Sequence, residues 1–406
     1  MTALRPLHAA PGTGGRANRR RRAATAPLVA ALLAGVVLAG CGTTRPDPPP
    51  YPQVSERGRY QPAWVVDSIG KAPVGFAPAV VGDAVWAASG AGRVSLIDAG
   101  GGRLRKRIDL DTPLAAGVGS DGRLQVVVTR AGEVVAFDRD GAERWRSALG
   151  AEVVAVPTVG DDIVVIRTVD GRILALDREG GSVRWTWRQQ PLPALTLRQN
   201  AGVAIDGDTI YAGLPAGRVV ALDARLGAPR WETVMSSARG ATELERLIDV
   251  AGTPVVTGER VCAIAYQGRV ACLRRDDGRI VWARDIQSGT GIAMRDDRIY
   301  TVDGSDLVRA FAVAGDDLWK QDAYVRRVMS APVEVDGRLL LTDRFGSLHV
   351  LDAANGAPLA RVEADGSGFT GRPVLPTATG VTRAGDGAAF AYAQTVGGSL
   401  VAVPLK

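Results

Sequence analysis

The sequence predicts an all-β protein, an eight-bladed β-propeller with four-stranded antiparallel blades. Three observations support this fold class. The 406 residues include 50 glycines and 46% hydrophobic side chains, a mixture typical of many short strands joined by turns. A pattern of glycine, strand, aspartate, turn and tryptophan recurs along the chain. The last copy of the pattern is incomplete, and the N-terminal end of the domain carries the part that it lacks.

The repeated unit starts at a glycine turn, runs through an apolar strand to an aspartate, turns again and ends at a tryptophan. Nearly complete copies occupy residues 132–145, 171–185 and 217–231. The copy at 268–282 has Arg274 in place of the aspartate, and weaker copies start at Gly92, Ser305 and Gly346. A repeat of this kind cannot bury its apolar faces alone, so the copies are expected to stack into one array.

The two ends of the domain complete each other. An eighth copy starts at Gly398 and stops before its tryptophan, whereas residues 61–66 form a strand around Trp64 with no preceding glycine strand. Pairing these ends closes the ring and removes exposed sheet edges. Residues 61–406 then provide about 43 residues for each of eight blades, the length that a four-stranded blade requires.

The residues that recur from copy to copy have structural interpretations. The turn glycines suit three-residue hairpin loops with the glycine in the left-handed conformation. The tryptophans are expected to pack between blades, beside the glycine turn of the next repeat. The recurring aspartates are interpreted as turn and cap residues rather than as catalysts; they are Asp138, Asp177, Asp223 and Asp352.

The N-terminal region predicts export and lipid attachment. Four arginines at 19–22 precede an apolar stretch, Ala26 to Ala39, which suits the core of a signal peptide. It ends in Leu-Ala-Gly-Cys41, which resembles the lipobox of bacterial lipoproteins. We therefore expect a signal peptide over 1–40, acylation of Cys41 and a flexible tether over 41–60. The alternative is an ordinary secretory signal with a chance cysteine.

Charge and histidine content exclude several classes of function. The net charge of +6 comes from six arginines in residues 1–41, and the remaining chain has 43 basic and 43 acidic residues. Nucleic-acid binding needs a basic surplus, so none is expected. Only His8 and His349 are present, which argues against a histidine-ligated metal site or a Ser-His-Asp triad.

Cys262 and Cys272 flank the turn at Gly268. A three-residue loop would place the two cysteines directly opposite each other, within disulfide reach, and the periplasm is oxidising. A two-residue loop would instead put the two thiols on opposite faces of the hairpin. We expect the disulfide.

The repeat resembles the pyrroloquinoline-quinone-type propeller repeat, and with the lipobox the chain from Cys41 onward resembles the BamB family of outer membrane assembly lipoproteins. The resemblance implies a non-enzymatic periplasmic scaffold without a cofactor, held to the outer membrane by lipid. The glycine after Cys41 also favours the outer membrane. Its implied partners are the POTRA domains of the barrel subunit BamA, other Bam complex subunits and unfolded outer membrane proteins.

Two segments carry the family resemblance most specifically. The first is Leu195-Thr-Leu197-Arg198, and the second contains Asp249. In the family, a Leu-x-Leu-Arg loop and an acidic loop contact the barrel subunit, which implies partner contacts for Leu195, Leu197, Arg198 and Asp249. A second acid of the family pattern is Ala251 here, with Glu243 and Glu245 nearby as replacements. Without the resemblance, Leu195 and Leu197 would read as the inward face of a strand.

Two other functions fit the same repeats. A quinone-dependent dehydrogenase would carry adjacent cysteines against its cofactor, and no two cysteines are adjacent in this sequence. An envelope scaffold lipoprotein with an unrelated partner is the other alternative.

Overall fold

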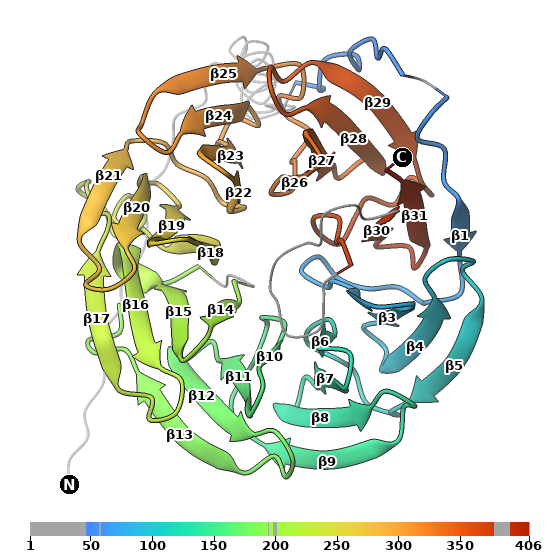
Figure 1. Cartoon of the computed structure of the whole chain (residues 1–406), viewed down its shortest axis with the longest axis vertical. Helices are drawn as coiled ribbons and strands as arrows, with labels where there is room; N and C mark the ends of the chain where they lie inside the picture. The colour runs from blue at the N-terminus through green and yellow to red at the C-terminus, as the bar shows by residue number, and fades with distance from the viewer. Residues whose placement is uncertain (1–45, 57, 194, 198–200, 377–389, 406) are drawn as a thin grey trace, which may run out of the picture. The chain divides into compact units, whose positions relative to one another are not determined.

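The computed structural model describes residues 46–56, 58–193, 195–197, 201–376 and 390–405. The compact unit Pro48–Lys406 is a ring of eight antiparallel sheets, and this confirms the predicted propeller (Figure 1). In seven sheets, four consecutive strands follow one another from the centre of the ring to its rim. We number the blades 1 to 8 in chain order.

The first four blades occupy the chain from residue 79 to residue 234. Blade 1 contains β2 (Ala79–Val81), β3 (Ala84–Ala88), β4 (Arg93–Asp98) and β5 (Leu104–Asp109). Blade 2 contains β6 (Gly119–Ser120), β7 (Leu124–Val128), β8 (Glu133–Asp138) and β9 (Glu143–Ala148). Blade 3 contains β10 (Thr158–Val159), β11 (Ile163–Arg167), β12 (Arg172–Asp177) and β13 (Val183–Arg188). Blade 4 contains β14 (Val203–Asp206), β15 (Thr209–Leu214), the short 3-10 helix η1 (Pro215–Gly217), β16 (Arg218–Asp223) and β17 (Pro229–Val234).

The remaining blades complete the ring. Blade 5 contains β18 (Val250–Thr257), β19 (Arg260–Ala265), β20 (Val270–Arg274) and β21 (Ile280–Arg284). Blade 6 contains β22 (Ile292–Arg295), β23 (Arg298–Val302), β24 (Val308–Ala312) and β25 (Asp317–Gln321). Blade 7 contains β26 (Val333–Val335), β27 (Arg338–Thr342), β28 (Ser347–Asp352) and β29 (Pro358–Glu363). Blade 8 contains β30 (Phe390–Gln394), β31 (Leu400–Pro404) and, from the other end of the domain, β1 (Trp64–Val66).

Blade 8 closes the ring as predicted. The N-terminal strand β1 pairs antiparallel with the C-terminal strand β31, with Trp64 opposite Ala402 and Val66 opposite Leu400. Towards the ring centre, an isolated bridge joins Val374 to Tyr392 of β30 at the place of an innermost strand. The ring is therefore closed by hydrogen bonds between the two ends of the domain.

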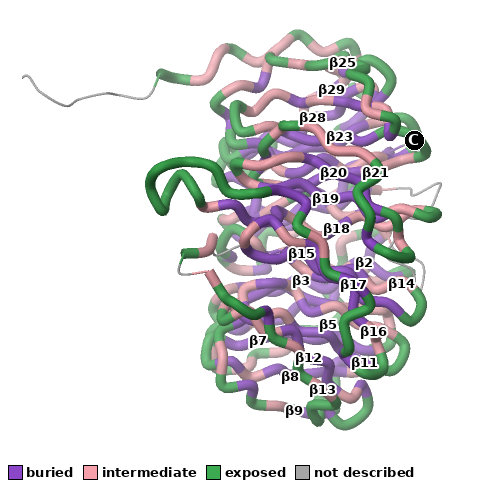
Figure 2. The backbone as a smooth tube through the Cα atoms, turned by 90° about the vertical axis from the view of Figure 1, so that its left-hand side faces the viewer, coloured by how far each residue is buried: buried purple, intermediate pink, exposed green. Residues whose placement is uncertain are grey.

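The burial of each strand depends on its place in the blade. The two middle strands are apolar and almost fully buried, as in β3, β7 and β11, because neighbouring blades cover both of their faces. The outermost strands β5, β9 and β13 are mostly exposed and rich in charged residues (Figure 2). The apolar core consequently lies between the blades.

The repeated tryptophans pack against the blade that follows their own. The indole N–H of Trp145 in blade 2 donates to the Arg178 carbonyl oxygen of blade 3 at 2.7 Å, and a Cβ on Gly181 would lie 2.4 Å from the Trp145 ring. The glycine therefore leaves the space that the ring fills. The same indole hydrogen bond is made by Trp64, Trp185, Trp231 and Trp319 to the following blade. The predicted packing of tryptophan against the next glycine turn is confirmed.

The recurring aspartates cap turns. Asp177 Oδ1 accepts hydrogen bonds from the N–H groups of Glu179 and Gly180, at 3.0 and 2.8 Å. Asp138, Asp223 and Asp352 accept equivalent bonds in their own turns. Their turn role is thereby confirmed.

The hairpin of β19 and β20 has the three-residue loop expected from its sequence. Cys262 pairs directly with Cys272, and the sulfur atoms are bonded at 2.03 Å. Unlike the other repeat glycines, Gly268 does not have positive φ; the preceding Gln267 has φ 48° instead. A Cβ at position 268 would lie 2.6 Å from Ser236 Oγ, so the tight fit requires glycine here. The oxidised state of the exported protein stays a prediction.

The compact unit begins earlier than residue 61. It starts at Pro48, because residues 49–56 contact blade 7 through Tyr51 and through a backbone hydrogen bond from Glu56 to Leu359. Residues 49–56 of the expected 41–60 tether are thus docked on the propeller. Cys41 and the predicted signal peptide lie outside the described residues. Within those that are described, no helix has the length and apolar character of a membrane span.

Candidate functional site

Two long loops, one on each side of blade 4, form the candidate site. The first joins β13 to β14 over residues 189–202, and the second joins β17 to β18 over residues 235–249. The first loop contains Pro191 and Pro193, which cannot donate to a strand ladder and so favour an irregular connection. Both loops are longer than the short turns within the blades, and inserted residues of a propeller often carry its binding function.

Asp249 joins the two loops. Its carboxylate is almost fully buried, with 2% of the residue exposed. Oδ2 accepts a hydrogen bond from the Leu197 N–H at 2.5 Å, and Oδ1 accepts one from the Ala216 N–H at 3.3 Å. The side chain at the end of the second loop therefore fixes the backbone of the first loop. Family resemblance implied a surface contact for Asp249, but the structure buries it beneath Leu197.

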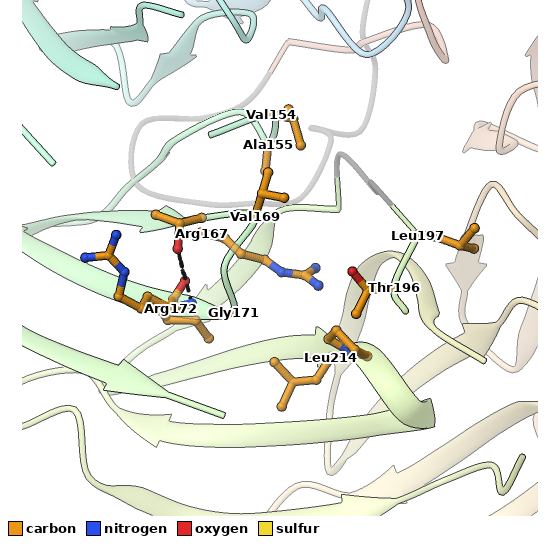
Figure 3. Close-up of a pocket in the computed structure, with 12 residues that line it drawn as sticks. Val154, Ala155, Arg167, Val169, Gly171, Arg172, Thr196, Leu197 and Leu214 are labelled. Carbon is orange, nitrogen blue, oxygen red and sulfur yellow. Dashed lines mark hydrogen bonds between the residues drawn. The ribbon is translucent and has the colours of Figure 1, made fainter. Parts of the chain in front are cut away.

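The charges of Arg167 and Asp249 interact at this junction. Burial raises the pKa of Asp249, while its backbone hydrogen bonds and the positive charge of Arg167 oppose that rise. Burial lowers the pKa of Arg167 to about 10, and the negative charge of Asp249 opposes that fall. Arg167 extends from the end of β11 towards Thr196 (Figure 3) and donates through Nη1 to the Ala201 carbonyl oxygen at 3.2 Å. Asp249 and Arg167 thus hold the first loop at Leu197 and Ala201 by hydrogen bonds to its backbone.

Apolar side chains are exposed on both loops. Leu195 is 48% exposed, Leu192 is 44% exposed and Leu244, on the second loop, is 70% exposed. Leu197 is half-buried at the small pocket that Arg167 and Thr196 also line (Figure 3). Leu195 is not the inward face of a strand, because it lies in the loop before β14. Arg198 lies outside the described residues.

The second loop stabilises its own turn with an acidic side chain. Glu245 accepts hydrogen bonds from the N–H groups of Ala241 and Thr242, at 2.8 and 3.0 Å. Glu243 is exposed and forms an ion pair with Arg246 at 3.5 Å. Ala251 lies in β18 and is 2% exposed, so an acid at this position would be buried. Of the two nearby glutamates, Glu245 thus binds the backbone of the loop, whereas Glu243 pairs with the side chain of Arg246.

Sequence reasoning missed three residues of this site. Arg167 ends an apolar strand, and its only signal in the sequence is a charge directly after Ile163–Ile166. Leu192 and Leu244 lie in the two loops, and both were visible as apolar residues among prolines or acids. None of the three belongs to the motif that drew attention to the loops.

Metal chemistry finds no support in the part of the chain that the structure describes. No group of three His, Cys, Asp or Glu side chains there is placed to hold a metal ion.

Comparison with known proteins assigns the chain to a family. The sequence profile described as outer membrane protein assembly factor BamB matches residues 90–308 and 304–400. The chain belongs to the BamB family. A BamB of Bordetella pertussis is 36% identical over 92% of this chain and 96% of its own length. One from Burkholderia pseudomallei is 35% identical over 90% of this chain and 97% of its own.

Solved structures agree with the family assignment. The crystal structure of BamB from Moraxella catarrhalis has a TM-score of 0.76 and 26% sequence identity, and the match covers 85% of this chain and all of that chain. Quinohemoprotein alcohol dehydrogenase from Comamonas testosteroni has a TM-score of 0.65 but only 13% identity, over 85% of this chain and 76% of that one. That second likeness shows a shared propeller fold alone. The named BamB relatives are outer membrane protein assembly factors.

Proposed function

We propose that this chain is a non-enzymatic lipoprotein scaffold of the β-barrel assembly machinery. It binds the periplasmic POTRA domains of BamA and assists the folding and insertion of outer membrane proteins. It works beside other Bam complex subunits and is tied to the periplasmic face of the outer membrane through Cys41. Membership of the BamB family over most of the chain supports this role.

The exposed leucines above a buried anchor carry the partner-binding proposal. Leu195 presents an apolar surface on a loop whose backbone is fixed from below by Asp249. A fixed loop loses little conformational freedom on binding, so ordering of the loop offsets little of the free energy gained by apolar contact. Leu192 on the first loop and Leu244 on the second are also exposed apolar side chains. A surface of this kind suits a folded partner domain.

The test uses the purified periplasmic region of BamA and the intact propeller. Leu195→Ser and Leu197→Ser are combined in one variant, and Arg198→Glu is made separately. Both are expected to weaken capture of the BamA region while leaving the melting temperature close to that of the wild type. Leu226→Ser is the matched control, because Leu226 is 59% exposed in the turn between β16 and β17, outside both loops. Unchanged capture by the double variant would contradict the proposal, and loss of folding would assign these leucines to the core.

The dehydrogenase alternative is tested separately. Protein supplied with pyrroloquinoline quinone and Ca²⁺ is expected to reduce no redox dye with alcohol or sugar substrates. Dye reduction that depends on both additions would replace the scaffold proposal.

A further inference from the structure

The segment before the first strand is docked on blade 7. The Tyr51 hydroxyl donates to Asp343 Oδ2 at 3.0 Å and accepts from Ser347 Oγ at 3.1 Å. Further along, the Glu56 N–H donates to the Leu359 carbonyl oxygen of β29 at 2.7 Å. Residues 49–56 therefore run against blade 7 and are held at two points.

The Tyr51 ring lies between two cations. The guanidinium carbon of Arg327 is 3.5 Å from the ring centroid, and that of Arg361 is 4.0 Å from it. Arg327 also donates to the Pro49 carbonyl oxygen. Cation–π contacts contribute about 0.5–2 kcal/mol each, more when the groups are partly desolvated. We call Arg327, Asp343, Ser347 and Arg361 the blade-7 clamp.

The clamp rests on a buried pair in the blade. Asp343 Oδ2 also contacts His349 Nε2 at 2.9 Å, and both side chains are essentially inaccessible to solvent. The His349 ring lies 5.5 Å from the Tyr51 ring and 4.8 Å from that of Tyr324. The polar groups that receive Tyr51 are thus preorganised by the core of blade 7.

An exposed aromatic residue lies beside the clamp. Asp343 Oδ1 accepts from the N–H groups of Phe345 and Ser347, both at 2.9 Å, and so shapes the turn between β27 and β28. Phe345 is 42% exposed, and the Arg344 guanidinium lies 5.4 Å from its ring centroid. Phe345 lines the same shallow hollow as Tyr51 and Arg327. An exposed ring next to a cation is the side-chain pair that suits a lipid headgroup region.

We propose that blade 7 is the edge of the propeller that faces the membrane, held there by Tyr51 and touching the lipid surface through Arg344 and Phe345. This inference rests on the proposed acylation of Cys41. Eight residue steps separate Cys41 from Pro49, which allows a reach of at most about 28 Å. With the clamp open, the chain would still be held at Glu56, fifteen steps from Cys41, and its reach would rise to about 52 Å. The clamp therefore nearly halves the distance allowed between blade 7 and the lipid.

The experiment places one fluorescent donor on blade 7 or on blade 3, which lies across the ring (Figure 1). Ala354→Cys and Glu179→Cys are matched sites, since both residues are exposed and follow a turn aspartate by two positions. Full-length acylated protein is reconstituted in vesicles of phosphatidylethanolamine and phosphatidylglycerol that carry an acceptor lipid. Energy transfer is expected to be higher from position 354 than from position 179. Equal transfer from the two sites would overturn the proposal.

Variants of the clamp and of the turn test the cause. Tyr51→Ala and Arg327→Gln are each expected to reduce the difference between the two sites, because they lengthen the free tether to Glu56, whereas Tyr51→Phe keeps the ring between the cations and preserves the difference. A difference of wild-type size in both Tyr51→Ala and Arg327→Gln, with wild-type melting, would refute the clamp. Phe345→Ser leaves the clamp in place and is expected to lower the transfer from position 354; unchanged transfer would refute the lipid contact.

Failure of the underlying anchor gives a different result. Protein that lacks acyl chains at Cys41 would remain in the aqueous phase on flotation, with no transfer from either site. Failure of the present inference alone would give protein that floats with the vesicles and shows equal transfer from both sites.

Discussion

Replacement of Asp249 by alanine separates a positioning role from direct partner contact. The carboxylate accepts the N–H groups of Leu197 and Ala216, at 2.5 and 3.3 Å, and is almost inaccessible to solvent. A hydrogen bond to a charged group contributes about 1.5–3 kcal/mol, and removal of the acceptor leaves both donors without their partner. Leu197 and Ala216 are only half-buried, so water can reach their N–H groups and reduce the loss. We call the observed conformation of the first loop, with the Leu197 N–H bound to Asp249, the closed loop. We expect Asp249→Ala to destabilise the closed loop by about 2 kcal/mol, which is roughly a 30-fold change in the equilibrium constant between its closed and open forms.

Two measurements follow this change. Hydrogen exchange of the Leu197 amide is expected to accelerate, because the closed loop protects it. Affinity for the BamA POTRA region is expected to fall by at most roughly the same 30-fold factor, since only the closed fraction of the loop binds. Denaturant unfolding checks that the rest of the propeller remains folded.

Asp249→Asn distinguishes the two roles of the carboxylate. The amide keeps one oxygen acceptor and the shape of the side chain but loses the charge. A positioning role predicts an effect between those of the wild type and Asp249→Ala. Weakened POTRA binding with wild-type exchange at Leu197 would refute the positioning argument, because it would require Asp249 to act on the partner directly.

Three further predictions concern the fold. Trp231→Phe loses the indole hydrogen bond to Arg275 and is expected to lower the free energy of unfolding by about 1 kcal/mol. Gly278→Ala should lower it more, because the added Cβ would meet the Trp231 ring at 2.5 Å. The reverse order in a denaturant titration would contradict the interblade packing. Burial lowers the pKa of His349, so the unfolded chain takes up a proton that the folded chain refuses, and stability should fall as the pH drops below about 6.5. His349→Gln should flatten that slope, and an unchanged slope would assign it to other groups. Joint replacement of Cys262 and Cys272 by alanine, which opens a link of sequence separation 10, should cost about 3 kcal/mol, and free thiols in the mass spectrum of exported protein would remove the basis of this prediction.

The sequence predicted the propeller because its repeat contains both the tryptophan and the glycine that pack together between blades. Each tryptophan needs a partner glycine one blade later, and Trp145 with Gly181 shows the pairing in the structure. Where the pattern changes, the structure changes with it. Lys106 takes the tryptophan position in blade 1, since it pairs with Leu96 as Trp145 pairs with Ala136. Its Nζ donates to the Asp140 carbonyl oxygen of blade 2 at 2.6 Å in place of an indole N–H. Fold class and ring closure therefore followed from residue types and spacing alone.

The site could be located from the sequence but not resolved. The segments around Leu195 and Asp249 indicated the loops, yet no local pattern reveals whether a carboxylate points outward or inward. Asp249 is buried because the backbone of a loop 52 residues earlier folds over it, and this is a long-range contact. For the same reason, the docking of Tyr51 was hidden, since its partner Asp343 lies 292 residues away.

The positions of these features around the ring connect the two proposals. The two candidate loops flank blade 4, whereas the clamp for the N-terminal segment belongs to blade 7, and the β1–β31 pairing holds the eight blades in one closed ring. A lipid anchor fixed at blade 7 therefore sets the direction in which the loops around blade 4 point. If the clamp opens, the same loops keep their structure and their affinity in solution but lose their fixed orientation to the membrane. Tyr51→Ala should consequently leave POTRA binding in solution unchanged while it impairs assembly on membranes, and loss of binding in solution would show that the clamp acts through the fold instead.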